Sequence, residues 1–195
     1  MQQSKMNIVI AGVGGQGILS IAGVIAQAAL AAGLRVKQSE VHGMAQRGGA
    51  VEAHLRISPD PIFSDLVPIG GAGIVCGMEP MEALRHLPHL NPENGWIVTA
   101  AEPLVNIPDY PAVETILAEI RRLPRHLILP VNEMAKAAGN VRSGNMVLLG
   151  ALSTRLPLPE TALLDGIARL FHAKGAAVVD VNLKAFAAGR TAACA

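Results

Sequence analysis

Cysteine and net charge are both scarce in this sequence. The 195 residues include two cysteines, Cys76 and Cys194, and no Cys-x-x-Cys motif, so the sequence shows no disulfide framework and cannot hold an iron–sulfur cluster alone. Sixteen basic residues against fifteen acidic ones leave a formal charge of +1 with no run of like charges, which argues against binding to nucleic acid or to anionic lipid. The six histidines have no metal-ligand spacing, and we expect no metal site.

Charged residues are also few, at 16% of the chain, while 51% of the residues are hydrophobic. A free monomer usually carries more solvent-seeking side chains, so this composition indicates surface that a stable partner covers. The N-terminal apolar run is too short and too broken by glycine for a secretory signal, and no apolar stretch comfortably spans a bilayer. We therefore expect a cytoplasmic location and no membrane association.

Strand-like and helix-like patterns alternate along the chain. A short β-branched run at residues 8–10 is followed by an apolar helix at 18–32 and a second strand at 34–39, which form the first half of a parallel α/β sheet. Later strands are expected at residues 73–76, 96–99 and 127–129, and helices at 81–87, 113–122, 131–138, 145–154 and 160–172. The sequence therefore predicts a single α/β domain over residues 1–195, with three α/β/α layers and a mostly parallel, Rossmann-like sheet of about five or six strands.

A further strand is expected at residues 51–57, where apolar residues alternate with Glu52, His54 and Arg56. This alternation is typical of a strand with one exposed face. The turn residues at 58–61 favour a hairpin, in which this strand pairs with the segment near residues 62–63.

A glycine-rich turn, Ala11-Gly-Val-Gly-Gly-Gln-Gly17, connects the first strand to the first helix. Its Gly12, Gly14 and Gly17 match the pattern of dinucleotide-binding turns, in which free amides at the helix start attract a phosphate. Glu40 ends the second strand, where an acidic residue would hydrogen-bond a ribose hydroxyl. Two interpretations stay open: bound NAD or FAD, or the same backbone used for another purpose.

A second glycine-rich loop follows, Val41-His-Gly-Met-Ala-Gln-Arg-Gly-Gly49. Parallel sheets gather their ligand-binding loops at the carboxyl ends of the strands, so this loop and the glycine turn should face the same crevice. Arg47 could clamp a carboxylate or a phosphate, or could instead pair with Glu40 or Glu52. His42 could polarise a carbonyl or relay a proton, or could serve only as a hydrogen-bonding residue of the loop.

A third polar segment lies late in the chain, at residues 139–145. Asn140 follows a glycine and fits a helix C-cap or a turn. Ser143 and Asn145 are residue types that cap a helix start, and we expect them to cap the next helix.

Four segments of the sequence together resemble a known family. They are residues 8–17, 39–49, 79–85 and 138–151, and the resemblance extends over roughly residues 6–190. The most specific part is the string His42-Gly-Met-Ala-Gln-Arg-Gly-Gly49 in combination with the glycine turn. On these motifs the chain is similar to the gamma-type domain of the 2-oxoacid:ferredoxin oxidoreductases.

The resemblance implies a subunit of an enzyme that oxidatively decarboxylates a 2-oxoacid, here indolepyruvate or another arylpyruvate. Such enzymes use thiamine diphosphate with magnesium, transfer the acyl group to coenzyme A, and send electrons through iron–sulfur clusters to ferredoxin. This sequence has neither a Gly-Asp-Gly segment with paired asparagines for the magnesium diphosphate nor a cysteine set for clusters. A larger alpha subunit is expected to carry both, and ferredoxin is expected to be reached through the complex.

By itself the chain is expected to bind no cofactor and to be inactive, and an isolated preparation could form a homodimer. Its crevice could contribute to binding coenzyme A or the arylpyruvate, or could only shape the subunit interface. The candidate binding residues are Gly12, Gly14, Gly15, Gln16, Gly17, Glu40, Gln46, Arg47, Gly48 and Gly49, with His42 as the candidate catalytic residue. The alternatives are a free-standing Rossmann oxidoreductase that binds NAD or FAD, and a nonenzymatic assembly module.

Overall fold

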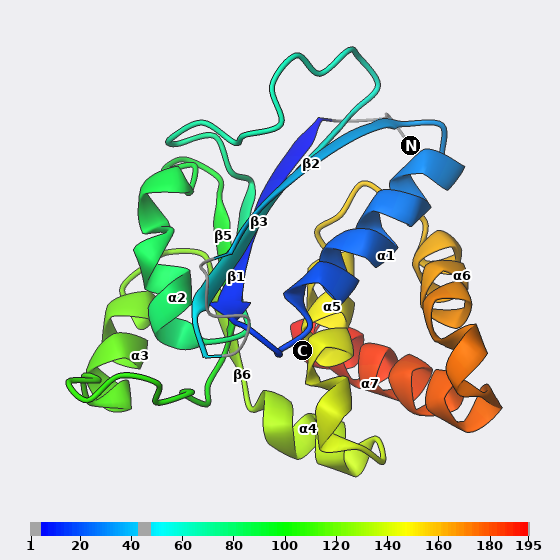
Figure 1. Ribbon diagram of the computed structural model, residues 1–195. Coiled ribbons are helices and arrows are strands. Elements are labelled where there is room, and N and C mark those ends of the chain that lie inside the picture. The colour runs from blue at the N-terminus through cyan, green and yellow to red at the C-terminus, as the bar shows by residue number, and fades with distance from the viewer. Residues whose placement is uncertain (1–4, 43–47, 195) are drawn as a thin grey trace.

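Six strands form one sheet in the order β2-β3-β1-β4-β5-β6 (Figure 1). The computed structural model describes residues 5–42 and 48–194, with residue 42 described by its backbone alone. β1, β4, β5 and β6 run parallel to one another, whereas β3 runs antiparallel to both of its neighbours. The strands are β1 Met6–Val13, β2 Arg35–His42, β3 Ala50–Ser58, β4 Ile74–Gly77, β5 Trp96–Ala100 and β6 His126–Leu129.

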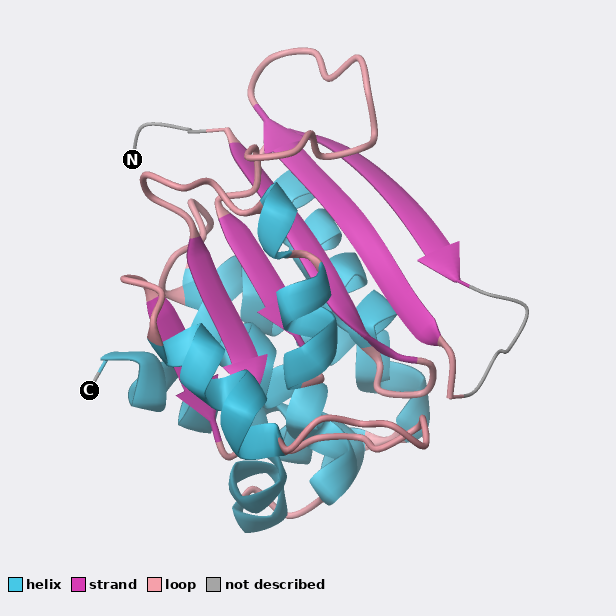
Figure 2. Ribbon diagram, turned by 90° about the vertical axis from the view of Figure 1, so that its left-hand side faces the viewer, coloured by secondary structure: helices cyan, strands magenta, loops and turns pink. Residues whose placement is uncertain are grey.

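Helices cover both faces of this sheet, as Figures 1 and 2 show. α2 and α3 lie on one face, and α1, α5, α6 and α7 lie on the other. The helices are α1 Ile18–Ala31, α2 Pro80–Arg85, α3 Val113–Arg121, α4 Val131–Ala137, α5 Gly144–Ser153, α6 Glu160–Phe171 and α7 Ala176–Cys194. The predicted α/β fold with a mostly parallel sheet is confirmed. Within residues 5–42 and 48–194, no helix has both the length and the apolar character that a membrane crossing needs.

The last helix, α7, is not predicted from the sequence, because its core-facing side is built largely from small residues. It packs directly on α5 through two glycines. A Cβ on Gly150 would lie 1.9 Å from the backbone oxygen of Phe186, and one on Gly189 would lie 1.8 Å from that of Val147. Glycine therefore allows the two helix backbones to touch, and Phe186 is the large side chain that α7 buries beside this contact.

The strand predicted at residues 51–57 is present, but its predicted pairing partner is wrong. β3 does not form a hairpin with residues 62–63, which belong to a loop, and instead lies between β1 and β2. Leu55 pairs with Ile8 on β1 and with Gln38 on β2. Pro59 and Pro61 lack amide donors, so the segment that follows β3 is poorly suited to return as a ladder strand.

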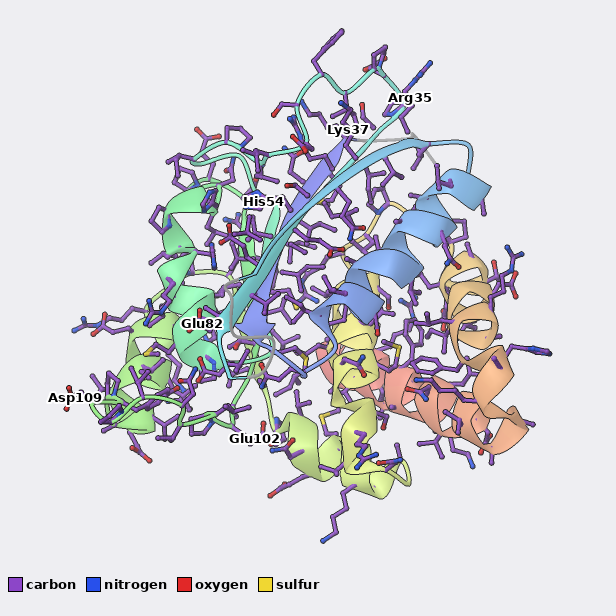
Figure 3. The ribbon with its side chains drawn as sticks, viewed as in Figure 1. Arg35, Lys37, His54, Glu82, Glu102 and Asp109 are labelled. Atoms are coloured by element: carbon purple, nitrogen blue, oxygen red, sulfur yellow. The ribbon has the colours of Figure 1, made fainter. Side chains whose placement is uncertain are left out.

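The face of β3 that was expected to be exposed is covered by the loop at residues 59–70, at the top of Figure 1. His54 is 3% exposed, and its Nδ1 accepts a hydrogen bond of 3.0 Å from the amide of Val67. Arg56 donates through Nη1 to the backbone oxygens of Ser64 and Leu66, at 2.9 and 3.2 Å. Two side chains of β3 thus hold this loop against the sheet, and Figure 3 shows His54 there.

His54 belongs to a cluster of three imidazoles and a carboxylate. Its ring centroid lies 5.3 Å from that of His89, which in turn lies 5.8 Å from that of His86. Glu52 lies 3.1 Å from His86 Nε2 and 3.7 Å from His54 Nε2. Burial lowers the pKa of both His54 and His86, although the nearby Glu52 carboxylate works in the opposite direction.

We expect the free energy of unfolding to fall as the pH decreases from about 7 to about 5. The unfolded chain protonates His54 near the ordinary value of 6.5, whereas the folded chain protonates it only at lower pH, so unfolding takes up a proton. In His54→Asn the amide oxygen can still accept from Val67, but the side chain does not titrate. The dependence of the unfolding free energy on pH should therefore be shallower in this variant, as measured by urea denaturation at a series of pH values.

His54→Phe is the matched control, because it removes the titration and the acceptor together. It should share the shallower dependence and be less stable than His54→Asn at every pH. A pH dependence in His54→Asn as steep as in the natural chain would contradict the prediction.

Candidate ligand-binding site

The glycine turn between β1 and α1 is closed over by its own Gln16. The Gln16 side chain accepts the amide of Val13 at 2.7 Å through Oε1 and donates through Nε2 to the backbone oxygen of Met78 at 3.2 Å. A Cβ on Gly12 would lie 2.8 Å from Gln16 Oε1. The first glycine of the motif therefore makes room for a side chain of the protein. Gly15 and Gly17 have φ values of +102° and +79°, which suit glycine.

The described end of the second glycine-rich loop contacts the glycine turn. The amide of Gly14 donates to the backbone oxygen of Gly49 at 2.9 Å. That amide is then not free for a phosphate, although in a dinucleotide site the corresponding glycine allows the backbone to approach the pyrophosphate. At the start of α1, the amides of Ile18 and Leu19 have no acceptor among the described residues, so this helix end keeps the capacity to attract an anion.

Glu40 does not lie beside the glycine turn. β3 separates β2 from β1, so Glu40 is displaced from the turn by two strand spacings, about 9–10 Å. Its exposed carboxylate instead accepts a hydrogen bond from Gln38 at 2.6 Å. The predicted ribose contact of Glu40 is therefore not available from this position. Gln46 and Arg47 lie outside the described residues, as does the side chain of His42, and the proposed roles of these three stay predictions.

A cavity of about 250 Å³ opens beside the glycine turn. Gln16, Glu102, Leu104, Arg142 and Asn145 are among the residues that line it. A second cavity, of about 510 Å³, is lined by the same Arg142 and Asn145 together with Ser20, Lys174 and Asn182. Arg142 therefore borders both spaces, close to the start of α1.

The two cations that line these cavities and the carboxylate that lines the smaller one differ in their partners. Neither Arg142 nor Lys174 makes an ion pair with any carboxylate in the described part of the chain. Glu102 is occupied, since its two carboxylate oxygens accept the amides of Val131 and Asn132 at 3.1 and 2.8 Å, at the first turn of α4. Figure 3 shows Glu102 at this end of the sheet. The start of α4 is thus neutralised by the chain itself. Lys174 lies over the Phe171 ring at 5.3 Å from its centroid, and neither cation is held by a carboxylate of the described residues.

The polar residues at 139–145 differ in part from their predicted roles. Asn140 forms the expected turn and accepts the amide of Arg142 at 2.9 Å. Ser143 makes no side-chain cap of α5 and donates to the backbone oxygen of Asn140 at 2.6 Å. Asn145 lies inside α5 and donates to the backbone oxygen of Gly17 at 3.3 Å, while its Oδ1 is buried without a partner. Ser143 thus stands at the predicted N-cap position, but its hydroxyl bonds to a residue three positions earlier and does not cap the helix. The cap predicted for Asn145 is wrong, because its amide makes a tertiary contact with Gly17.

Sequence motifs missed two residues of this site, Glu102 and Arg142. Glu102 lies just beyond β5, and its position after a strand of a parallel sheet was the signal that could have found it. Arg142 lies within the late segment of the family resemblance but has no local pattern of its own. In residues 5–42 and 48–194 no three or more His, Cys, Asp or Glu side chains are arranged to hold a metal ion.

Comparison with known proteins places this site in a family context. The family model described as pyruvate ferredoxin/flavodoxin oxidoreductase matches residues 7–192. The chain is 39% identical to indolepyruvate oxidoreductase subunit IorB of Archaeoglobus fulgidus, over 95% of this chain and 94% of the relative. It is 40% identical to the subunit of the same name from Pyrococcus horikoshii, over 97% and 96% of the two chains.

A solved structure is also similar. It is the 2-oxoglutarate:ferredoxin oxidoreductase from Magnetococcus marinus with 2-oxoglutarate, coenzyme A and succinyl-CoA bound, at 25% identity and a TM-score of 0.76. The similarity covers 100% of this chain and 32% of the Magnetococcus chain. The present chain therefore corresponds to about a third of that longer polypeptide.

Replacing Gly12 with alanine should lower the free energy of unfolding by about 1–3 kcal/mol, because the added methyl would lie 2.8 Å from Gln16 Oε1. In the double variant Gly12→Ala/Gln16→Ala the loss should be smaller than the sum of the two single losses, since the nearest obstructing atom is gone and only Ile18 and Met78 remain, at 3.1 Å. Urea denaturation of the four proteins measures this cycle.

Gly23→Ala provides the matched control, because Gly23 lies inside α1 and a Cβ there would meet nothing within 4 Å. That variant should be unchanged or more stable by up to about 1 kcal/mol. Strictly additive losses in the double variant would show that Gln16 is not what restricts position 12.

Proposed function

Because this chain belongs to the pyruvate ferredoxin/flavodoxin oxidoreductase family, we propose that it is the small subunit of a 2-oxoacid:ferredoxin oxidoreductase that acts on indolepyruvate or another arylpyruvate. The observation that carries the proposal is the near full-length match to two subunits named for indolepyruvate oxidoreductase, at 39% and 40% identity. The reaction joins the acyl group of the decarboxylated substrate to coenzyme A and passes electrons to ferredoxin.

Within such an enzyme, this chain supplies one module and a larger alpha subunit supplies the redox machinery. The sequence has two cysteines, which are too few for iron–sulfur clusters, and no segment typical of a magnesium diphosphate site. The proposal is supported by the Magnetococcus relative, in which a region similar to this whole chain is 32% of a longer polypeptide. We place the thiamine diphosphate, magnesium and clusters in the partner subunit, ferredoxin at the assembled complex, and the complex in the cytoplasm.

The crevice beside the glycine turn is proposed to hold the phosphates of coenzyme A. Three features of this chain support that role. The amides of Ile18 and Leu19 and the guanidinium of Arg142 have no partner among the described residues, and the ammonium of Lys174 lines the second cavity that Arg142 borders. A guanidinium donates two parallel hydrogen bonds to a phosphate, and a helix start favours negative charge. The residues present therefore fit a phosphate-bearing ligand. Coenzyme A would supply the thiol that accepts the acyl group, and this chain would hold and orient its carrier.

The same geometry disfavours the Rossmann dehydrogenase alternative. The Gly14 amide is bonded to Gly49, the Gln16 side chain fills the space over Gly12, and Glu40 is two strands from the turn. An ordinary dinucleotide site needs all three of these positions. The kinetic test below distinguishes the remaining alternative, a nonenzymatic assembly module, from a role in binding coenzyme A.

In the complex reconstituted with its larger subunit, Arg142→Ala should raise the KM for coenzyme A about tenfold with little change in kcat, which is the loss expected for one charge-assisted hydrogen bond to a phosphate. The measurement is 2-oxoacid-dependent reduction of a viologen dye at a series of coenzyme A concentrations. Arg169→Ala, an exposed cation on α6 that lines neither cavity at the crevice, should keep the natural KM.

An Arg142→Ala complex with the natural KM would favour a role in assembly alone. Dye reduction by the isolated chain would show that the division of labour between the two subunits is wrong.

The isolated chain should not bind NADH in the micromolar range and should be colourless, because the dinucleotide geometry is not formed. Fluorescence titration with NADH and an absorption spectrum of the purified chain check this expectation. A yellow preparation, or saturable NADH binding in that range, would favour the free-standing oxidoreductase instead.

A further inference from the structure

The loop between β5 and α3, residues 101–112, is tied to three separate parts of the molecule. Near its start, Glu102 accepts two amides from the first turn of α4. In its middle, Asn106 Nδ2 donates to the backbone oxygen of Gly48 at 2.8 Å. Near its end, the Tyr110 hydroxyl donates to the buried carboxylate of Glu79. We refer to residues 101–112 as the crossing loop, and Figure 3 shows Glu102 and Asp109 on it.

The contact of Asn106 reaches the glycine turn in two steps. Gly48 is followed by Gly49, whose backbone oxygen accepts the amide of Gly14. Asn106 is therefore linked through this short glycine segment to the turn that begins α1. Residues 106 and 48 lie 58 positions apart in the sequence, so the connection exists only in the folded chain.

Gly48 and Gly49 have no side chains with which to hold themselves in place. Gly48 has a φ of +79°, a conformation that glycine adopts easily and that other residues rarely adopt. Two consecutive glycines have many accessible backbone conformations, and ordering them carries a large entropic cost. Hydrogen bonds to their backbone groups are the means available to fix them, and Asn106 and Gly14 provide one each.

The outer ties hold the crossing loop so that Asn106 can act as a fixed donor. Glu102 binds two amides at once, and burial raises the pKa of Tyr110, which keeps its hydroxyl protonated as a donor to Glu79. The loop is also built with Pro103, Pro108 and Pro111, which restrict its backbone. Leu104 and Glu102 line the cavity beside the glycine turn, so the same loop forms a wall of the candidate site.

We propose that Asn106 is a positioning residue, which fixes the Gly48–Gly49 backbone against the glycine turn and so sets the shape of the crevice for coenzyme A. The inference rests on the proposed function for the identity of the ligand, and on the hydrogen bonds themselves for the mechanism. It assigns a role to a segment in which the sequence shows no binding motif. Asn106 acts through Gly48 and needs no contact with the ligand.

Positioning has a kinetic signature that general stability lacks. The bond from Asn106 to Gly48 is exposed to solvent, so its loss should change the unfolding temperature little. The loss should instead loosen residues 48–50 and lower the population of the crevice shape that binds the ligand. The lower population of the binding-competent shape raises the KM for coenzyme A. It leaves kcat unchanged, because the bound state reached at saturation is the same.

The test uses the assembled complex with Asn106→Ala and Asn106→Asp, and Asn94→Ala as an exposed asparagine at the opposite end of the sheet. We expect a KM for coenzyme A raised about two- to tenfold in Asn106→Ala, the range that one neutral hydrogen bond produces. Asn106→Asp should have a larger effect, since it places a carboxylate against the backbone oxygen of Gly48. Hydrogen exchange at residues 48–50, measured without ligand, should be faster in both variants and unchanged in Asn94→Ala.

The two readouts separate this inference from the proposed function. If the natural complex shows no coenzyme A dependence, the proposed function fails, and the exchange rates still decide whether Asn106 fixes the glycines. A natural exchange rate at residues 48–50 in both Asn106 variants would overturn the inference. Faster exchange with a natural KM in a coenzyme A-dependent complex would also overturn it, because the glycine segment would then not shape the binding site.

Discussion

The antiparallel position of β3 between β1 and β2 is the constraint from which the other features of the site follow. In a wholly parallel arrangement, the strand after the first helix lies beside β1 and brings its carboxyl end to the glycine turn. Here β3 occupies that place and pairs with β1 along the full length from Met6 to Val13. The start of β3 therefore brings Gly49 to Gly14, while Glu40 is carried away on the edge strand.

This arrangement explains why a dinucleotide-type sequence does not form the geometry of an ordinary dinucleotide site here. The turn keeps the backbone that such motifs need, including left-handed conformations at Gly15 and Gly17. The first amides of α1 also have no acceptor in the part of the chain that the structure describes. Two features that a dinucleotide site needs are taken up by the protein itself. The Gly14 amide donates to Gly49, and the Gln16 side chain fills the space over Gly12. What remains is an anion-attracting helix end with Arg142 beside it, which suits a phosphate group without the rest of a dinucleotide.

The surface agrees with a chain that works inside a larger assembly. Phe63 is 92% exposed, Ile69 70% and Val105 66%, and each lies in a loop and not over a helix face. Covering apolar side chains of this size with a partner usually lowers the free energy of the complex. The loop with Phe63 and Ile69 is held by His54 and Arg56, so its apolar residues are presented on a fixed backbone. The few charged residues of the sequence thus go together with exposed apolar side chains in these loops.

The sequence by itself determined the fold class and most of the elements, though not α7, because periodicity, glycine turns and β-branched runs are local signals. Strand 8–10, helix 18–32 and the glycine turn were all predictable in this way. The hairpin predicted for residues 51–57 and the cap predicted for Asn145 were wrong, since the partners of these residues lie in other parts of the chain. Only the tertiary structure placed Gln16 over Gly12, Asn106 at Gly48 and Arg142 in one cavity with Gln16. The physical reason is that each of these contacts joins groups through space, and no local pattern of residues records which distant group will be the neighbour.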